Sequence, residues 1–323
     1  MDRGVSCVSD RFERWLRRNG NKWNERPGIQ RVGAAACWAA WRLVVLLRHP
    51  MARGRRLRVL ATACRFEIQR RFSTREFIAR LPRGATLICP PWTGSSRAPL
   101  CLGIEDFEEQ TFLLDTLRSG DVAVDVGAYF GIYTVLMAAC GATVHAFEPA
   151  RRVHEVLTRS INANGFAQPV TVHPIALSDF TGRASFTTEL DSGNRLTGRD
   201  AMGAPATSEV AVDTLDHWAD LHDLTGLFVI KIDAEGADGS VLSGATAVLK
   251  KFDPVVIVEY WDDAGALRAL LRSHGFEARR YVPEEHRLVA RSDAAGTDGN
   301  LIACSAARME DVQRRLTQRE FGQ

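Results

Sequence analysis

Short apolar runs alternate with amphipathic stretches over the last two thirds of the chain. The apolar runs predict seven strands, at residues 121–126, 142–147, 169–175, 227–233, 255–260, 277–282 and 300–305. Helical spacing of apolar positions predicts helices at residues 105–118 and near 130–140, 150–164, 237–250 and 263–273. Strands separated by helices are typical of an α/β fold with a Rossmann-like, doubly wound, mostly parallel seven-stranded sheet.

Two further strands are predicted at residues 184–189 and 208–213. Between them, residues 190–207 are polar and glycine-rich, which predicts a loop. This loop either covers a substrate, with Asn194 and Arg195 as polar contacts, or is a surface insertion. Residues 307–323 predict a charged helical tail exposed to solvent.

Charge divides the chain more sharply than composition, which is ordinary for a globular protein at 46% hydrophobic and 25% charged. Residues 1–83 hold 20 basic and 6 acidic side chains, whereas the remainder holds 21 and 33. We therefore expect a basic helical extension at 1–83, an α/β domain at 84–306 and the tail. The extension is either packed on the domain with solvated arginines, or it contacts an anionic membrane peripherally. No nucleic-acid-binding signature is present, and we expect no nucleic-acid partner.

Compartment signals are few. The first 20 residues lack the apolar centre of a signal peptide. The apolar stretch 34–47 has 14 residues with Arg42 inside, short of the roughly 20 needed to span a bilayer. The seven cysteines form no CxxC pair. These features predict a cytoplasmic protein, with attachment to the inner face of the membrane as the extension's second interpretation.

Residues 125–134, DVGAYFGIYT, join the first strand of the predicted sheet to its helix. Gly127 permits a tight turn, and Gly131 lets the helix begin close to the strand. Glu148 ends the second strand, where a carboxylate can bind both hydroxyls of a ribose. The loop lacks the middle glycine of GxGxxG, and Asp125 would repel a pyrophosphate. These residues favour S-adenosylmethionine, which carries a cationic sulfonium and ammonium, over NAD.

The stretch Ser178-Asp179 follows the third strand. Asp179 or its neighbouring backbone is a candidate contact for the adenine amino group. A simple turn is the alternative, because Ser and Asp favour turns in any context.

Six stretches together resemble the FkbM family of S-adenosylmethionine-dependent methyltransferases. They read DVAVDVGAYFGIYT (121–134), VHAFEPARR (144–152), NANG (162–165), ALSDFTG (176–182), VAVDTLDHW (210–218) and IKIDAEGADGSVLSGA (230–245). The resemblance implies a class I methyltransferase fold over 84–306 and methyl transfer to a hydroxyl of a sugar, glycolipid or secondary metabolite. It supports cofactor contacts by Asp125, Gly127, Ala128, Tyr129, Gly131, Glu148, Ser178 and Asp179. Tyr129 and Asp238 stand where the family usually has Asn and Glu.

An alcohol needs help to lose its proton during methyl transfer. Asp233 closes the fourth strand and Glu235 lies just beyond it, so both are candidates to orient the acceptor or remove its proton. Glu259, at the end of the fifth strand, is a candidate third carboxylate, and the three could hold a divalent metal. We favour direct action by Glu235 or Asp233, and we predict no metal site. Lys231 is interpreted as the structural partner of a carboxylate.

Histidine is a frequent general base, and four histidines lie near strand ends. His145 is predicted to be packed within the second strand. His173, His217 and His222 lie near loops, but their spacing does not place them at the acceptor.

The sequence thus predicts an O-methyltransferase whose partner is a small-molecule or glycan hydroxyl. A non-catalytic binding module that keeps the fold is the alternative, disfavoured by the retained acids Asp125 and Glu148. An NAD-dependent oxidoreductase is disfavoured by the missing glycine.

Overall fold

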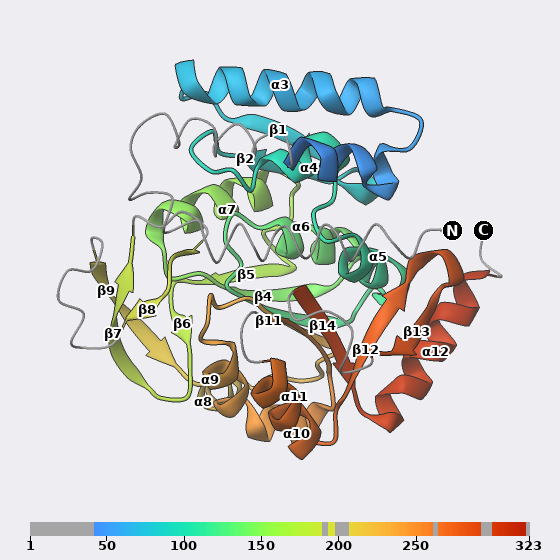
Figure 1. Ribbon diagram of the computed structural model, residues 1–323. Helices are drawn as coiled ribbons and strands as arrows, with labels where there is room; N and C mark the ends of the chain where they lie inside the picture. The colour runs from blue at the N-terminus through green and yellow to red at the C-terminus, as the bar shows by residue number, and fades with distance from the viewer. Residues whose placement is uncertain (1–41, 189–192, 198–206, 261–263, 292–298, 321–323) are drawn as a thin grey trace.

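The computed structural model describes residues 42–188, 193–197, 207–260, 264–291 and 299–320 (Figure 1). Its central sheet has eight strands in the order β13-β12-β14-β11-β10-β3-β4-β5. These are β3 (Val122–Val126), β4 (Thr143–Phe147), β5 (Val170–His173), β10 (Val229–Ile232), β11 (Val255–Tyr260), β12 (Glu277–Val282), β13 (Arg287–Ala290) and β14 (Gly299–Cys304). Pairing is parallel from β5 to β11 and antiparallel from β11 through β14 and β12 to β13. The predicted α/β fold with a mostly parallel sheet is confirmed.

The seven strands predicted for the main sheet all lie in it, and β13 is the additional one. It follows β12 after a 3-10 turn at Pro283–Glu285 and pairs with it at the sheet edge. The four residues RLVA are too few to give an alternating pattern that stands out from the surrounding polar sequence.

Helices cover both faces of the sheet. One core includes side chains from α5 (Phe107–Thr116), α6 (Ile132–Ala139), α7 (Arg151–Ala163) and α12 (Ala306–Glu320). The opposite core includes side chains from α8 (Leu215–Leu221), α9 (Asp238–Ser243), α10 (Thr246–Phe252) and α11 (Ala264–Ser273). Along β11, Val255 and Ile257 join the first core while Val256 and Val258 join the second. Burial on both faces explains why these strands read as continuous apolar runs.

The helix predicted at 237–250 is wrong in its continuity, because the chain forms α9 and α10 with Gly244 between them. A Cβ atom at Gly244 would lie 2.1 Å from the Ser178 carbonyl oxygen. Glycine therefore lets two segments of backbone meet at this break.

The described part of the N-terminal region packs on the first face (Figure 1). Residues 42–48 are helical, and a 3-10 turn at Pro50–Ala52 leads into α3 (Arg56–Phe72), β1 (Phe77–Arg80), a turn at Pro82–Gly84, β2 (Thr86–Cys89) and α4 (Arg97–Leu102). Strands β1 and β2 form an antiparallel pair. The predicted boundary after residue 83 falls in the turn between them. Predictions for residues 1–41 lie outside the described part of the chain.

A four-stranded sheet lies beside the main one, in the order β6-β9-β7-β8. Its strands are β6 (Ala176–Leu177), β7 (Gly182–Thr187), β8 (Leu196–Thr197) and β9 (Thr207–Asp213). Strands β7 and β9 correspond to the two added strands predicted from the sequence, and β8 lies within the predicted loop.

Helix α12 is not the solvated tail that its charge pattern predicts. Val312 and Leu316 are buried, and they belong to the first core. Arg315 pairs with Asp121, at 2.6 Å between Nη1 and Oδ2. The tail is therefore an integral layer of the domain.

Candidate functional site

A cavity of about 990 Å³ opens at the carboxyl edge of the parallel strands. The ends of β3, β4, β10 and β11 supply its floor, and the stretch 193–196 supplies part of its wall. Ligands of open α/β sheets bind at this edge, where the strand order reverses between β3 and β10. The cavity thus lies at the sheet edge where the sequence predicts ligand binding.

The glycine loop turns tightly over this edge. Amide groups of Gly127 and Ala128 both donate to the Phe147 carbonyl oxygen at 3.0 Å. Gly127 has a φ of +75°, and a Cβ atom there would lie 1.9 Å from the Asp233 carbonyl oxygen. At Gly131, with a φ of +99°, a Cβ atom would lie 2.3 Å from Leu157. Both positions therefore require glycine, one for contact with the β10 loop and one for contact with α7.

Glu148 is buried at the end of β4 and is bound to the glycine loop. Its Oε2 accepts from the Tyr129 amide at 2.9 Å, and its Oε1 accepts from the Ala150 amide at 2.7 Å. Burial raises the pKa of Glu148 to about 7, although both hydrogen bonds oppose this shift. The Glu148 carboxylate therefore binds the glycine loop and also faces the cavity.

Tyr129 has a left-handed backbone, with a φ of +49°. Asn adopts this region more readily than an aromatic residue does, which gives a physical reason for the family's usual choice. The centroid of the Tyr129 ring lies 5.0 Å from that of Phe130 and 6.5 Å from that of Trp92, and both ring pairs are edge-on. These contacts hold the side chain against the wall of the cavity.

Asp125 and Lys231 are register partners on adjacent strands β3 and β10. Asp125 is buried and accepts from the Thr134 hydroxyl at 2.5 Å, and burial raises its pKa to about 6. Lys231 is 1% exposed, and its Nζ lies 3.6 Å from the Asp233 Oδ2. Burial lowers the pKa of Lys231, but nearby carboxylates, Asp233 first among them, outweigh this and raise it. Lys231 thus pairs with a carboxylate, the geometry that its structural interpretation requires.

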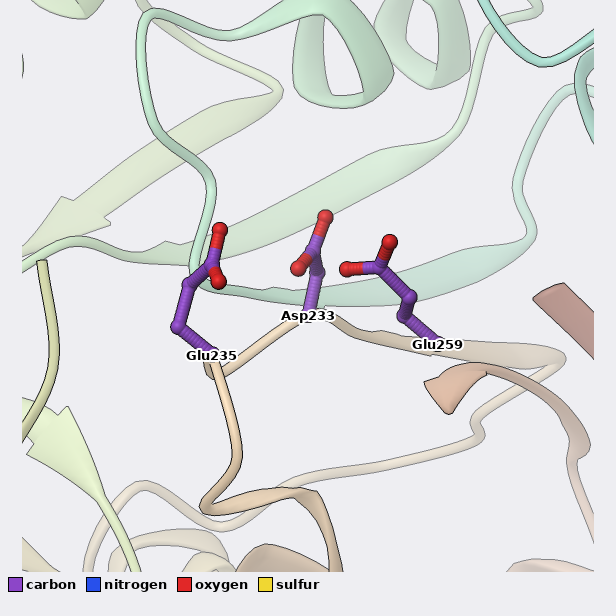
Figure 2. Close-up of side chains that lie close together, drawn as sticks. All are labelled: Asp233, Glu235 and Glu259. Atoms are coloured by element: carbon purple, nitrogen blue, oxygen red, sulfur yellow. The ribbon is translucent and has the colours of Figure 1, made fainter. Parts of the chain in front are cut away.

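Three carboxylates converge at the carboxyl ends of β10 and β11. Figure 2 shows the side chains of Asp233, Glu235 and Glu259 on the same side, with Glu259 reaching toward Asp233. One oxygen from each lies within 4.8 Å of the others. Burial and repulsion from Asp233 raise the pKa of Glu259 to about 10. The direction of this shift favours the protonated form of Glu259 beside the Asp233 carboxylate.

The loop that carries Asp233 and Glu235 is fixed at both ends. The Asp233 amide donates to the Val126 carbonyl oxygen at 3.0 Å. Asp238 accepts from the amides of Ala234 at 2.9 Å and Gly236 at 3.2 Å. Asp238, where the family commonly has Glu, therefore stabilises this loop, and Glu235 within it has a φ of +48°.

Ser178 and Asp179 directly follow Leu177, which lines the cavity. Ser178 is buried, its amide donates to the Asp213 carbonyl oxygen at 2.9 Å, and its hydroxyl donates to Asp179 at 3.2 Å. The cavity lining on this side includes Ile175, Ala176 and Leu177 but not these two residues. Of the cofactor residues predicted from the sequence, Asp125, Gly127, Ala128, Tyr129, Gly131 and Glu148 do line the cavity.

The predicted histidines lie away from the cavity lining. His145 and His173 pack against Trp218, each with ring centroids 4.9 Å apart, and His222 stacks on the same indole at 4.6 Å. Burial lowers the pKa of His173 to about 4. His217 binds Asp213 at 2.8 Å. None of the four lines the cavity, so the acidic loop supplies the candidate bases.

Several lining residues were not predicted from the sequence. Glu105 and Asp106 enter the cavity ahead of α5, and Asp106 accepts from the Tyr133 hydroxyl at 2.7 Å. Burial, followed by repulsion from Asp106, raises the pKa of Glu105 to about 8. Arg42 and Arg97 also line the cavity. Acidic residues are common at the start of a helix, where they interact favourably with the helix dipole. The position of Glu105 and Asp106 in the cavity is therefore evident only from the tertiary fold.

Comparison with known proteins agrees with this geometry. Residues 125–278 match the model of the methyltransferase FkbM domain. The chain is 30% identical over 252 residues to the 31-O-demethyl-FK506 methyltransferase FkbM of Streptomyces tacrolimicus, which covers 66% of this chain and 93% of that protein. It is 24% identical over 223 residues to the methyltransferase sdnD of Sordaria araneosa, covering 57% of this chain and 86% of that protein.

Solved structures with similarity to this chain include the methyltransferase FkbM from Methylobacillus flagellatus KT, at 16% identity and a TM-score of 0.39. That alignment covers 76% of this chain and 59% of the other. Another is M. jannaschii TYW2 in complex with AdoMet, at 14% identity and a TM-score of 0.40, covering 72% and 86%. The family itself is shown by the sequence relative that matches along nearly its whole length. The chain belongs to the FkbM family of methyltransferases.

Proposed function

We propose that the protein transfers a methyl group from S-adenosylmethionine to a hydroxyl of a sugar, glycolipid or secondary metabolite. One observation carries this proposal: the glycine loop and the acidic loop share one cavity and touch through Gly127 and the Asp233 carbonyl. A donor held by the first loop would therefore lie beside the carboxylates of the second.

The residues present fit a cationic nucleoside donor. Gly127 and Gly131 leave the backbone of the loop open to close approach. Glu148 offers a carboxylate to ribose hydroxyls, and Ile175 and Leu177 offer an apolar wall to adenine. Ser178 and Asp179 follow that wall directly and stay candidates for the adenine amino group. The acidic groups around the loop favour a sulfonium and an ammonium over a pyrophosphate.

The chemistry asked of this chain is mainly alignment and removal of one proton. S-adenosylmethionine supplies a methyl group bound to a positively charged sulfur. As the acceptor oxygen forms its bond to that carbon, the carbon–sulfur bond breaks, and the hydroxyl proton passes to a carboxylate. We assign this carboxylate to Glu235 or Asp233, with Lys231 beside Asp233 stabilising its ionised form.

The acceptor is assigned to the hydroxyl class on two grounds. Carboxylates at the acceptor side suit a proton that must leave during transfer. In addition, the relative from Streptomyces tacrolimicus is named for methylation of an oxygen on FK506. We place the reaction in the cytoplasm, because the described cysteines Cys64, Cys89, Cys101, Cys140 and Cys304 are free thiols.

Transfer of labelled methyl from S-adenosylmethionine into extracts of the source organism tests the proposal. We expect the full chain to label a hydroxyl-bearing product, and Glu235→Gln to lower the rate by about 10²-fold or more. Glu310→Gln, on the exposed side of α12, is the matched control and should keep full activity. We expect a chelator to leave the rate unchanged. Equal rates for both variants would remove Glu235 from the reaction, and loss of activity with the chelator would instead assign the three carboxylates to a metal.

A further inference from the structure

Helix α3 is the outermost element of the N-terminal region (Figure 1). Its inner face is well packed, since Val59, Ala63 and Phe66 are buried. Helix α4 lies beneath it and contributes Cys101 and Leu102 to the same small core. The outer face meets no other element among the described residues. Packing within the chain therefore does not explain which residues this face carries.

An apolar stripe runs the whole length of that outer face. Leu57 is 84% exposed, Ile68 63% and Phe72 85%, and the exposed residues Ala61 and Cys64 lie between them. The spacing 57, 61, 64, 68 and 72 places all five on one side of an α-helix. A single exposed apolar residue needs no explanation, but a continuous stripe indicates a surface that meets an apolar medium.

Arginines flank this stripe on both sides. At 100° per residue, Arg58 and Arg65 lie along one flank, with Arg56 and Arg71 along the other, and all four are exposed. The acidic residue of α3, Glu67, is half-buried and is neutralised by pairing with Arg97 of α4 and with Arg70. The outer face is therefore apolar at its centre and cationic at its edges.

We propose that the outer face of α3 docks on a bilayer that contains anionic phospholipid. The apolar stripe would enter the acyl boundary while the flanking arginines bind lipid phosphates. A second copy of the same face would bring arginines against arginines, and a nucleic acid would leave Leu57 and Phe72 without an apolar partner. No helix within the described ranges has the length and apolar character needed to cross a bilayer, so α3 would lie in the plane of the interface.

Docking would also orient the catalytic domain. Helix α4 packs against α3, and its residues Arg97 and Ala98 line the cavity. The lipid surface would then lie one helix layer from the cavity wall. Membrane binding through α3 does not depend on the proposed methyl transfer, so either can fail without the other.

Co-sedimentation with vesicles tests the proposal on the full chain. We expect binding to vesicles of phosphatidylglycerol mixed with phosphatidylcholine, and little binding to phosphatidylcholine alone. Leu57→Gln/Phe72→Gln should weaken binding by at least about tenfold. Its matched control, Leu221→Gln/Phe180→Gln, changes two exposed apolar side chains elsewhere and should bind as the unmodified chain does.

Charge is tested separately. Arg58→Gln/Arg65→Gln should weaken binding by at least about tenfold, and added salt should weaken it further. Lys250→Gln/Lys251→Gln removes the same charge from α10, at the far end of the molecule in Figure 1, and should have little effect. Sedimentation by analytical ultracentrifugation without lipid shows whether the stripe instead joins two copies. Equal binding to both lipid compositions, equal binding by stripe and control variants, or dissociation of a dimer by Leu57→Gln/Phe72→Gln would overturn the proposal.

Discussion

Individual residues of the glycine loop link the two halves of the site. The sequence predicts a tight turn at Gly127, and the structure shows in addition that the Asp233 carbonyl oxygen approaches this glycine closely. Glu148 binds the same loop through the Tyr129 amide. The glycine loop and the acidic loop are thus coupled through main-chain atoms, which substitution of surface side chains would leave intact.

Gly127→Ala should disrupt this coupling. The added Cβ would lie 1.9 Å from the Asp233 carbonyl oxygen, so one of the two loops must move. We expect loss of about 2 kcal/mol or more in unfolding free energy and at least about tenfold weaker donor binding. Gly120→Ala is the matched control, because Gly120 has a φ of +89° but no atom within 4 Å of the added Cβ. Equal effects of both substitutions on donor affinity would show that the contact between Gly127 and the Asp233 carbonyl does not contribute to donor binding.

Donor affinity should depend on pH through Glu148. Its pKa is raised to about 7, so the carboxyl group is ionised above that pH and protonated below it. Ribose hydroxyls bind the ionised form better, and affinity should therefore fall as pH decreases through about 7, by about tenfold at pH about 6. Calorimetric titrations across this range measure the effect, with Glu148→Gln expected to give a weaker and flatter profile. A profile unchanged by that substitution would assign the titration to another group.

Among the elements, those with strong periodicity were predictable and those that depend on a few contacts were not. Apolar runs buried on both faces define the strands of the parallel core, whereas the predicted helix is divided at Gly244, where the Ser178 carbonyl oxygen approaches the backbone. Helix α12 has few apolar residues, and only its docking on the sheet shows that they are buried. The position of Glu105 and Asp106 in the cavity could not be predicted for the same reason, because it depends on packing of α5 against α6.

The docking of α12 gives a stability prediction. Arg315 binds both Asp121 oxygens, at 2.6 and 3.1 Å, and its guanidinium lies 4.0 Å from the centre of the Phe228 ring. Arg315→Ala should lower the unfolding free energy by about 2 kcal/mol, because Asp121 would lose a partner in a mostly buried position. Arg314→Ala, on the exposed side of the same helix, should change it by less than about 0.5 kcal/mol. Urea unfolding measures both, and similar midpoints for the two variants would contradict the assigned role of α12.

At the scale of the whole molecule, charge and chemistry are segregated. The carboxyl edge of the parallel sheet gathers carboxylates around the glycine loop, while α3 presents arginines and apolar side chains on the outermost layer (Figure 1). The excess of basic residues in the first 83 positions and of acidic residues in the rest corresponds to this division in the described part of the chain. The acidic sheet edge would then recognise a cationic donor, and the basic helix α3 would recognise an anionic surface.

Calorimetric titration of the full chain with S-adenosylmethionine tests the central claim most directly, since it needs no knowledge of the acceptor. The account predicts saturable binding that Glu148→Ala weakens by at least about tenfold and that Glu310→Gln leaves unchanged. Absence of binding by protein shown to be folded would contradict the claim and would favour a non-catalytic module that keeps the fold.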